Sequence, residues 1–486
     1  MTEQRVRATL PELDISSDNV LRLWDDGSAL RSTQSDRADY YDGDQAILDE
    51  DEERSDGLTR NLVVTNWVRY IADQHVGFIT AQPFNYTAPE GVEKTEKEAV
   101  KGLTDLFQSL QIDGIDSTHL RQALLYGYSV EVHSYNDAGV QITEYDPREW
   151  VIVYDEMDQV RAGIHRCAQA KGTVYEDALL ADDLIVFTVY TSVHKTVYHQ
   201  TKGDKGAAVL TEEVVETHHY GEVPVVVFQI TSDRSSFISD ALISQQDVFN
   251  KTRSAMADDI QYNVDALLVL SGYEPDALFE KDEDGKTYYQ KIRENRLLPL
   301  NKEGEAKFLV RDVGHEVIIA DLHEARDAIH MMGRIADIAM IVGATGQTSG
   351  IALKLKLKPQ IEQAELFMKY LTRGLRRRLD LITTVWSTAN QGAGKLEGID
   401  ISYTLNIPVN ETELWEAVGS LEPFLTLESI LKLIPSIDDP EAEAEAKRTE
   451  VEEATERALE TMVAREEVSG VNAEDNQNEQ GDLRDG

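Results

Sequence analysis

Cysteine is almost absent from this chain of 486 residues, since Cys167 is the only one. A single thiol excludes an intrachain disulfide and a zinc site built on cysteines. No apolar run approaches the roughly 20 residues that span a bilayer, and the polar segment 1–19 lacks the charged-then-apolar pattern of a signal peptide. These absences predict an intracellular protein that is neither secreted nor inserted in a membrane.

Basic residues are also few, with 47 Lys and Arg against 89 Asp and Glu and a net charge of −42. Sequence-blind DNA binding needs cations that neutralise phosphates, so this balance argues against it. It suits a protein that repels DNA over most of its surface. Hydrophobic residues make up 41% of the chain, enough for most of it to fold, and its length predicts two to four structural regions.

Several catalytic motifs are missing. No GxxxxGK followed by Ser or Thr occurs, and the glycine-rich stretch 343–350 lacks the lysine of a phosphate-binding loop. No GxSxG nucleophile elbow and no internal repeat is present. Nucleotide hydrolysis and serine-hydrolase chemistry are therefore not expected.

Matches to metal-binding and acid–base motifs are also weak. Segment 280–285 resembles the first half of a calcium loop, but Lys291 stands where a bidentate Glu is required, which favours an Asp-Gly hairpin turn. The pairs His218/His219 and His323/His330 lack ligand spacing and are interpreted as structural. Asp146 and Asp155-Glu156 could form a carboxylate pair, although such coincidences are expected in so acidic a chain. No catalytic residue, metal or cofactor is predicted.

The chain is organised around residues His315–Arg378. In the first part of this stretch, apolar residues are spaced alternately four and three positions apart, which is typical of a helix packing along another helix. Such a helix would pack either against Ser239–Asn263 or between subunits. The residues of this seam are Ile318, Leu322, Ala325, Ile329, Met332, Ala336 and Ala339.

A glycine-rich segment follows this helix. Gly343, Gly346 and Gly350 end it and permit positive φ angles. Lys354, Lys356 and Lys358 then alternate with leucines, which would place the lysines on one side of an extended chain. Pro359 is expected to open a helix that carries Arg373 and Arg376–Arg378.

This stretch is basic within an acidic protein, with eight Lys or Arg against Glu362 and Glu365 between Ile351 and Arg378, a local charge of +6. Two interpretations stay open. The lysines are either a solvated amphipathic segment or a mobile loop that meets a polyanion.

Residues 1–60 are acidic and turn-rich and are predicted to form a surface arm with a short amphipathic stretch at 20–24. Helices are predicted within Asn61–Tyr86, Thr95–Leu110 and Asp116–Tyr126. Period-two patterns between about 127 and 232 predict an antiparallel meander. Its strands are Ser129–Ser134, Gly139–Tyr145, Val151–Tyr154, Val160–Cys167, Leu184–Tyr190, Lys195–His199 and Val223–Ile230.

The second half is predicted to be a helix, a small insert and a second helix, so that an antiparallel helix pair carries the insert at its tip. The first helix is Ser239–Asn263, with Ile238, Leu242, Phe249, Met256 and Ile260 on one side, and Ala266–Leu270 is strand-like. Later elements are a strand at Ile399–Ile407, helices at Glu411–Leu421, Leu427–Ile434 and Glu441–Glu467, and a disordered tail.

Several local strings, in this order and spacing, resemble the portal proteins of tailed double-stranded-DNA bacteriophages of the long-tailed siphovirus type. They lie between about Tyr40 and Glu467, leaving the arm before Tyr40 and the acidic tail unmatched. The strings are Tyr40–Asp44, Asn61–Asn66 running to Asp73 and Val76-Gly77, Tyr126–Tyr128, Tyr145–Arg148 with Val153–Asp155, Val223–Val225 and Thr348–Lys354.

The resemblance implies an α+β fold, a portal-type subunit with a helix-rich wing containing a β module, a two-helix stem, a small α/β clip, a long wing helix and a helical crown. The regions are 1–60 arm or outer wing, 61–237 wing, 238–265 first stem helix, 266–315 clip, 316–342 second stem helix, 343–358 tunnel loop, 359–410 long wing helix and strand, 411–470 crown, and 471–486 disordered tail.

The same resemblance implies a homo-oligomeric ring, typically of twelve subunits, at one capsid vertex of the virion, assembled in the host cytoplasm. Double-stranded DNA would enter through it during packaging and leave at ejection. Further implied partners are the terminase large subunit, the major capsid and scaffolding proteins and a head–tail adaptor, with no membrane involved.

The implied DNA-facing tunnel loop comprises Gly343, Gly346, Gln347, Thr348, Ser349, Gly350, Lys354, Lys356 and Lys358. Its lysines would make brief backbone contacts against an otherwise repelling wall, or would pair with acids of a neighbouring subunit. Two other hypotheses remain: another virion ring protein such as an adaptor, which is usually much shorter, and a metal-dependent hydrolase or nuclease using Asp146 and Asp155.

Overall fold

The computed structural model describes residues 6–7, 16–50, 59–89, 94–136, 139–170, 174–175, 178–179, 184–202, 208–264, 267–271, 285, 287, 290, 305–309, 315–337, 350–389, 398–407, 426–431, 443–455 and 457. The chain divides into two compact units. The first comprises Met1–Gly346 and Leu355–Asn406, and the second comprises Gln347–Lys354 and Ile407–Gly486. The fold is a mixture of helices and largely antiparallel sheets.

The N-terminal region contains two helices, α1 (Ser17–Asp26) and α2 (Ser28–Asp42), followed by a short 3-10 helix η2 (Ala46–Asp49). Val20 and Leu23 of α1 are buried against the strands of a sheet. Ala38 of α2 belongs to a second apolar cluster. The prediction of a turn-rich surface arm is therefore wrong for these residues, because the amphipathic pattern at 20–24 reflects packing onto the sheet.

The β module consists of two sheets instead of one continuous meander. One sheet has the order β12 (Val225–Gln229), β3 (Tyr128–Asn136), β4 (Gly139–Tyr145). The other has the order β1 (Val6–Arg7), β5 (Trp150–Tyr154), β6 (Val160–Gln169), β9 (Leu184–Tyr190), β10 (His194–Lys202), β11 (Ala208–Thr217). The seven predicted strands are confirmed, but a short 3-10 helix, η3 (Pro147–Glu149), intervenes between β4 and β5.

Strand β11 was not predicted from the sequence. It pairs along its length with β10, with a register shift at Val197/Tyr198, and of its side chains only Leu210 is buried. A strand that is exposed on nearly every residue carries no period-two hydrophobic signal. Two further strand pairs are short. Strand β2 (Asn85–Thr87) pairs with β15 (Asp400–Ser402), and β7 (Val174–Tyr175) pairs with β8 (Ala178–Leu179). Of these four strands only β15 was predicted, as part of a longer strand at 399–407.

Three helices follow α2 and η2 in the chain: α3 (Trp67–Ile79), α4 (Lys94–Ser109) and α5 (Ile112–Tyr126), of which α5 packs on the three-stranded sheet and contacts both other helices. Helices α4 and α5 agree with the prediction. Helix α3 begins later than the apolar stripe from Asn61, since Asn66 is its N-cap and accepts a hydrogen bond from the Arg69 amide at 2.9 Å.

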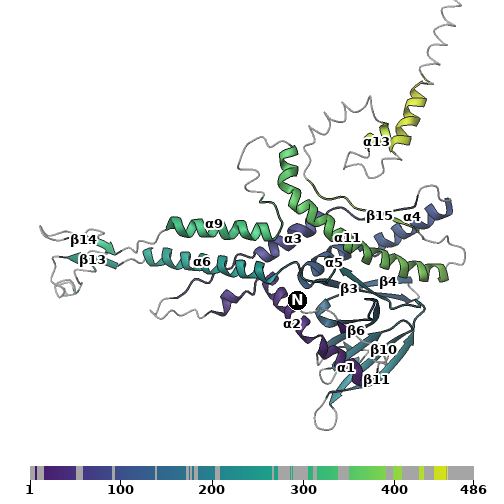
Figure 1. The fold of residues 1–486 in the computed structure, drawn as a ribbon, viewed down its shortest axis with the longest axis horizontal. Coiled ribbons are helices and arrows are strands. Elements are labelled where there is room, and N and C mark those ends of the chain that lie inside the picture. Colours follow the sequence, from purple (N-terminus) through teal and green to yellow (C-terminus); the bar gives the residue numbers. More distant parts are fainter. Residues whose placement is uncertain are drawn as a thin grey trace, which may run out of the picture. The chain divides into compact units, whose positions relative to one another are not determined.

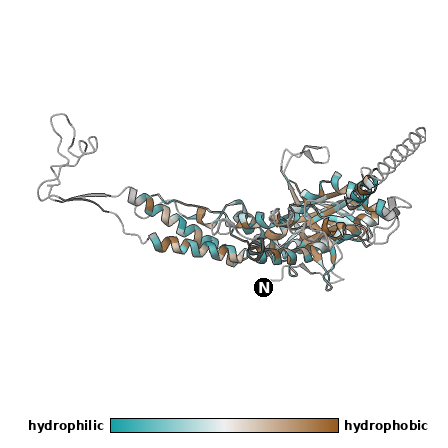
Figure 2. Cartoon of the chain, turned by 90° about the horizontal axis from the view of Figure 1, so that it is seen from above, coloured by the Kyte–Doolittle hydropathy of each residue, from teal (hydrophilic) through white to brown (hydrophobic). Residues whose placement is uncertain are grey.

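The predicted helix–insert–helix order is present in the first unit. Helix α6 (Asp240–Val264) leads to β13 (Leu267–Ser271), and β14 (Glu305–Leu309) leads back to α9 (His315–Met332). Strands β13 and β14 are antiparallel partners, and α6 lies beside α9 (Figure 1). Both helices carry hydrophilic and hydrophobic residues along their length (Figure 2).

Helix α11 (Gly350–Ala389) is longer than predicted and contains Pro359 in its interior. The extended conformation expected for the lysine segment is therefore wrong from Gly350 onward. In the second unit, α13 (Leu427–Leu431) lies within one predicted helix, and residues 443–455 are helical and largely exposed, as predicted for that stretch. The predicted helix at 411–421 and the predicted tail at 471–486 lie outside the described residues.

Candidate functional site

The α9 seam faces α6 over its first part. Leu322, Ala325 and Ile329 are buried in one apolar cluster with residues of α6 and α3, and Ile318 packs against the edge of this cluster. From α6, Leu242 and Phe249 belong to this cluster. Ile260, which was predicted on the same side of the helix, is instead 48% exposed. The contact is therefore closest where α6 and α9 approach α3.

The seam ends earlier than its sequence pattern suggests. Met332 is 42% exposed, Ala336 lies after the helix, and Ala339 lies outside the described residues. Arg334 has a φ of 51°, its amide donates to the Met331 carbonyl, and the Ile335 amide donates to the His330 carbonyl. These bonds form a Schellman motif, which closes α9 and buries Ile335. The motif uses Arg334 in the left-handed position where glycine is usual, so Gly333, one residue earlier, was not taken as the end of the helix, which was predicted at Gly343.

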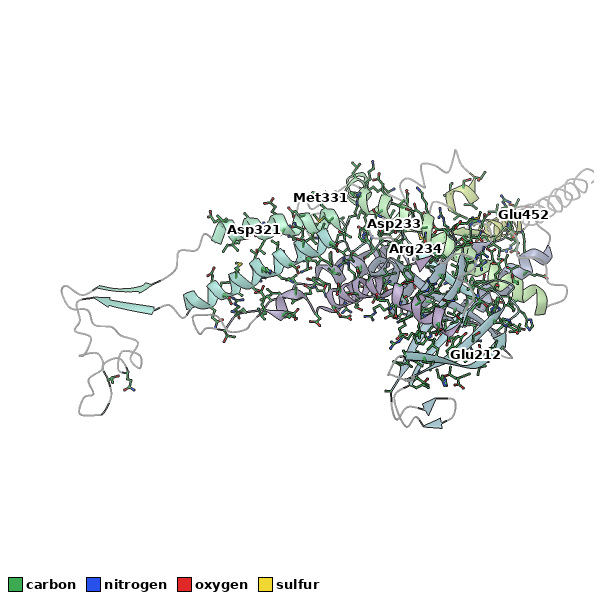
Figure 3. The ribbon with its side chains drawn as sticks, turned by 60° about the horizontal axis from the view of Figure 1, so that its bottom comes forward. Glu212, Asp233, Arg234, Asp321, Met331 and Glu452 are labelled. Atoms are coloured by element: carbon green, nitrogen blue, oxygen red, sulfur yellow. The ribbon has the colours of Figure 1, made fainter. Side chains whose placement is uncertain are left out.

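Apolar side chains remain exposed on both helices. On α9 they include Val317, which is 72% exposed, and Met331, which is 78% exposed near the C-terminal end of the helix (Figure 3). Val248 and Ile260 are exposed on α6. Exposed apolar side chains mark a surface that meets another protein where they form a contiguous patch.

One face of α6 forms a polar ladder, made of the side chains of Gln246, Asn250, Ser254 and Asp258, which recur every fourth residue. Their oxygens accept hydrogen bonds from alternate backbone amides of the segment 61–67, which precedes α3. The donor–acceptor distances are 2.9 Å for Trp67 N to Gln246 Oε1, 3.0 Å for Thr65 N to Asn250 Oδ1, 2.9 Å for Val63 N to Ser254 Oγ and 2.7 Å for Asn61 N to Asp258 Oδ1.

The ladder is buried at one end. Gln246 and Asn250 are both fully buried, Gln246 Nε2 also donates to the Thr65 carbonyl at 2.7 Å, and Asn250 Nδ2 donates to Gln45 Oε1 at 2.6 Å. Side chains of α6 thus satisfy a backbone segment that pairs with no strand among the residues that the structure describes. The string Asn61–Asn66 is the partner of this ladder, a role that its apolar stripe did not reveal.

The three candidate lysines lie on the first turns of α11. Lys354, Lys356 and Lys358 are all exposed, and Lys358 pairs with Glu362 at 3.6 Å. Because the segment is helical, Lys354 and Lys358 share a side of α11, and Lys356 points about 200° away from Lys354. Gly350 begins the helix, and the other candidates, Gly343, Gly346, Gln347, Thr348 and Ser349, lie outside the described residues.

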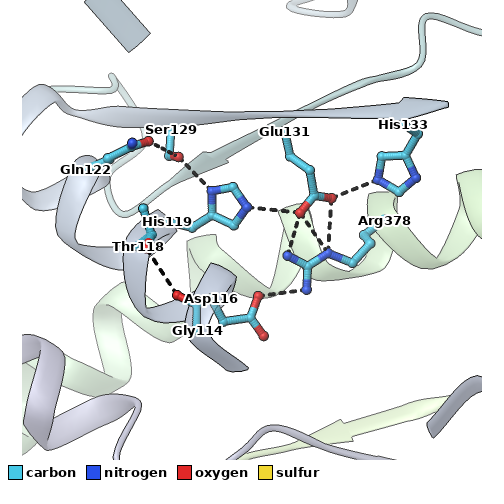
Figure 4. A network of polar contacts seen from close by, with 9 residues as sticks. All are labelled: Gly114, Asp116, Thr118, His119, Gln122, Ser129, Glu131, His133 and Arg378. Atoms are coloured by element: carbon cyan, nitrogen blue, oxygen red, sulfur yellow. Dashed lines mark hydrogen bonds and ion pairs between the residues drawn. The ribbon is translucent and has the colours of Figure 1, made fainter. Parts of the chain in front are cut away.

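The position of α11 is fixed by a buried ion-pair network, which the sequence did not reveal (Figure 4). The fully buried guanidinium of Arg378 donates to Glu131 of β3 through Nε and Nη2, at distances down to 2.7 Å, and Nη1 lies 2.7 Å from Oδ1 of Asp116 on α5. Nε2 of His119 and of His133 lie 2.9 and 2.7 Å from the two oxygens of Glu131. One arginine therefore connects α11, α5 and β3.

The electrostatics of this network follow from burial and charge. Burial acts to raise the pKa of Glu131, but Arg378 and the two histidine donors outweigh it and hold that pKa well below its usual value. Burial raises the pKa of Asp116 despite the nearby Arg378. Burial lowers the pKa of Arg378, but Asp116 and Glu131 raise it well above its usual value. The network holds an ionised Arg–Glu pair in the core.

Behind the network, α11 approaches β12 closely. A Cβ atom on Gly374 would lie 2.4 Å from Cδ1 of Phe228, so only glycine permits this approach. The Phe228 ring stacks on His119 with centroids 4.2 Å apart. The close packing excludes water from the ion pair.

The acidic residues considered for hydrolysis have local structural roles. Asp146 caps η3 through the Arg148 amide and binds the Arg148 guanidinium at 2.7 Å. Asp155 accepts from the amides of Met157 and Gln159 at 2.9 and 2.8 Å and from Arg161. The Gln159 amide is the main cause of the lowered pKa of Asp155. Both carboxylates are engaged in turns.

The predicted structural histidines fall into two groups. His330 is buried, with Nδ1 2.9 Å from the Arg326 carbonyl oxygen and its ring edge-on to Trp67, and Nε2 of His218 donates to the Thr191 carbonyl at 2.9 Å. His219 and His323 are exposed. Within the described residues there is no group of three or more His, Cys, Asp or Glu side chains that could hold a metal ion. The described helices also include none long and apolar enough to cross a membrane.

Comparisons with known proteins show which family the chain belongs to. Among solved structures, the chain is similar to a chain from the neck of an empty GTA particle computed with C6 symmetry, with 14% sequence identity, a TM-score of 0.41 and coverage of 77% of this chain and 91% of that chain. A search of curated proteins finds no match. The sequence model of the family described as phage portal protein, SPP1 Gp6-like, matches residues 22–457. The chain therefore belongs to the SPP1 Gp6-like phage portal proteins, a structural and non-enzymatic family of the bacteriophage virion.

Proposed function

We propose that this chain is the subunit of a ring-shaped channel at one capsid vertex, through which double-stranded DNA enters during packaging and leaves during ejection. The observation that carries the proposal is the family match over residues 22–457. The ring, of about twelve copies by the family resemblance, would dock the terminase large subunit and the head–tail adaptor and contact the capsid and scaffolding proteins.

Within this proposal, α6 and α9 are the stem and the insert that starts with β13 and ends with β14 is the clip. The exposed apolar residues on α6 and α9 support a surface that copies of the chain cover in the ring. The two sheets with α3–α5 form the wing, α11 is the long wing helix, and the region 411–470 is the crown.

The DNA-facing part is proposed at the start of α11 and the segment before it. A net charge of −42 per subunit keeps a polyanion away from most of the protein, so a few exposed lysines suffice for brief contacts. Lys354 and Lys358 share one side of the helix, so only that side or the opposite side with Lys356 can face a central DNA at one time.

The first experiment is electron microscopy of the purified chain together with its native mass. Rings with a central hole and about a dozen copies are expected. A monomer or dimer at all salt and protein concentrations contradicts the proposal.

The second experiment compares lysine variants in phage assembly. Lys354→Gln/Lys358→Gln and Lys356→Gln should differ in DNA packaging or retention while the rings still form, and Lys369→Gln, an exposed lysine further along α11, is the matched control. Equal effects of all three variants would exclude a sided DNA contact. Loss of the ring itself would assign the lysines to the contact between subunits.

A further inference from the structure

Strand β11 forms one end of the six-stranded sheet and, among the residues that the structure describes, pairs only with β10 (Figure 1). At the other end of this sheet, β5 is covered by the short strand β1. Helix α1 contacts β11, but Leu210 is the only residue of the strand that is buried. An edge strand presents N–H and C=O groups to which another strand can bind. Within the described part of the chain, β11 therefore leaves an open edge of ten residues.

The residue types of β11 favour pairing with a further strand. Val209, Val214 and Val215 are 42%, 39% and 50% exposed, and β-branched side chains stabilise strands. Because Val214 and Val215 are adjacent, they point to opposite faces of the sheet. The edge thus carries exposed apolar side chains on both faces, as do edge strands that associate.

The middle of β11 holds two features that oppose such pairing. Glu212 and Glu213 are both exposed, and Figure 3 shows where Glu212 lies on the strand. Tyr198 of β10 lies opposite Glu212 and Val197 lies opposite Val214, so Glu213 is an extra residue that forms a β-bulge. Charged side chains and bulges are two of the devices by which natural edge strands avoid association.

Few positive groups lie near these two carboxylates. Lys195 pairs at 3.0 Å with Glu216, the third glutamate of the strand, and Oε1 of Glu213 lies 3.6 Å from Nδ1 of His199. A histidine offsets a carboxylate only when it is protonated. No lysine or arginine of the described residues forms an ion pair with Glu212 or Glu213. The centre of the edge is therefore negative.

A second copy of the chain would bring the same charges to the same place. Antiparallel pairing over the full length of two β11 strands sets Ala208 opposite Thr217 and Glu212 opposite Glu213, because the middle of the strand falls between the two glutamates. The glutamates of both copies then meet at the centre of the contact. Like charges directly opposite each other destabilise a strand pair.

We propose that the outer edge of β11 is a surface for pairing with β11 of a second copy, and that Glu212 and Glu213 keep it closed. The apolar residues and the open edge supply the attraction, and the two glutamates supply a repulsion that is specific for this partner. The inference does not rest on the ring or on the DNA channel. Where copies of the chain gather, it leaves α6 and α9 as their apolar contact.

The first test neutralises the two glutamates in the full chain. Glu212→Gln/Glu213→Gln should associate at about tenfold lower protein concentration than the original chain, because two opposed like-charge pairs are removed. Sedimentation velocity at about 150 mM salt measures the association, and hydrogen exchange should become slower in β11. If rings form, the additional association appears as linked rings, with a mass above that of the original ring.

Glu98→Gln/Asp105→Asn is the matched control, since it changes the net charge equally at two exposed positions of α4. The control should sediment like the original chain. Equal association of both variants would reduce the effect to the net charge of the chain and overturn the proposal. Unchanged sedimentation of the Gln variant, folded by far-ultraviolet circular dichroism, would show that the edge does not pair, which also overturns it.

The second test reverses the charges. Glu212→Lys/Glu213→Lys alone should stay apart, because like charges again meet at the centre of the strand pair. Mixed with the original chain it should pair one to one, since each glutamate then faces a lysine. Hydrogen exchange in β11 should slow only in the mixture. A mixture that sediments as two separate components would contradict the proposed pairing.

Association of the Lys variant with itself would show that the charges do not control the edge, and the proposal would be wrong.

Discussion

Four arginines near the middle of α11 look equivalent in the sequence but have different surroundings. Arg373 is exposed and lies over the ring of Tyr370 at 5.1 Å, and Arg376 is exposed. Arg377 binds Glu222 at the surface, whereas Arg378 is fully buried with Glu131 and Asp116. The helical period places only one of these adjacent residues toward the core, so a local charge count overstates the positive surface of α11.

Removing Arg378 should unfold the protein more easily than removing its neighbour. Arg378→Met leaves Glu131 and Asp116 as buried carboxylates without their cation, which costs about 3–5 kcal/mol of unfolding free energy. Arg377→Met, at the partly exposed pair, should cost less than about 1 kcal/mol. Denaturant unfolding measures both.

A double-mutant cycle adds a sharper criterion. Arg378→Met with Glu131→Gln removes both charges and should cost less than the sum of the single changes. Additive costs would mean that the two residues act independently, contrary to the observed contacts.

His75 gives the protein a pH dependence of its own. Burial lowers the pKa of this histidine to about 4, and Nε2 lies 2.8 Å from the Gly333 carbonyl oxygen. The unfolded chain, with a pKa near 6.5, takes up a proton first, so His75 should lower stability by about 3 kcal/mol as the pH falls from 6.5 to 4. His75→Gln should flatten the profile of unfolding midpoint against pH over this window, and His323→Gln, at an exposed site, should not. A profile unchanged by His75→Gln would show that other groups set the acid sensitivity.

At the scale of elements, the helices and strands that bury one face are the ones that could be predicted from the sequence. Helices α4, α5 and α6 and the strands of the β module show the period of their burial, so their positions follow from hydrophobic spacing. Segment 61–66 was misassigned to a helix because its partners are side chains of α6, almost 200 residues away in the chain. The end of α9 was missed because Arg334 takes the left-handed position that glycine usually occupies. The start of α11 was missed because the leucine–lysine alternation, interpreted as extended, also fits a helix.

The candidate site was predictable only in part. The seam residues Leu322, Ala325 and Ile329 are buried as their spacing indicated, but the buried network around Glu131 joins residues from three separate elements. Such long-range polar pairs leave no periodic signal.

The polar ladder should hold α3 and its preceding segment on α6. Gln246→Leu removes the acceptor of the Trp67 amide and the donor of the Thr65 carbonyl inside the protein, which should cost about 1–3 kcal/mol. Hydrogen exchange at Thr65 and Trp67 should become faster. Ser244→Leu introduces the same side chain on an exposed position of α6 and should leave this exchange unchanged. Equal protection in Gln246→Leu would show that the ladder does not hold the segment.

At the scale of the whole molecule, the dominant property is acidity. Each chain carries a net charge of −42, and the acids outnumber the bases by 89 to 47. Copies of the chain therefore repel one another at long range, and apolar contacts must act against this repulsion in any ring. In the proposed ring, exposed residues such as Val317 and Met331 are expected to supply apolar surface for that contact.

Ring formation should therefore respond to salt. Raising the ionic strength from about 10 mM to about 1 M shortens the Debye length from roughly 30 to 3 Å and should shift the chain toward rings. Native mass and analytical ultracentrifugation over this range measure the shift. If rings fall apart as salt rises, ion pairs between copies hold them together and the apolar contact is secondary.

In the polar ladder on α6, the repeat distance of the helix differs slightly from the repeat distance of the chain segment that it binds. Every fourth residue of a helix advances about 6.0 Å, whereas every second residue of an extended chain advances about 6.4–6.8 Å. The slip of about half an ångström per rung adds up to roughly 1 Å between Asn61 and Thr65, after which the chain turns, since the Trp67 amide also donates to the Thr65 carbonyl at 2.9 Å, and side chains of unequal length, from Gln246 to Ser254, absorb the slip. A much longer ladder would lose register, so the mismatch itself limits how far a single extended segment can follow a straight helix.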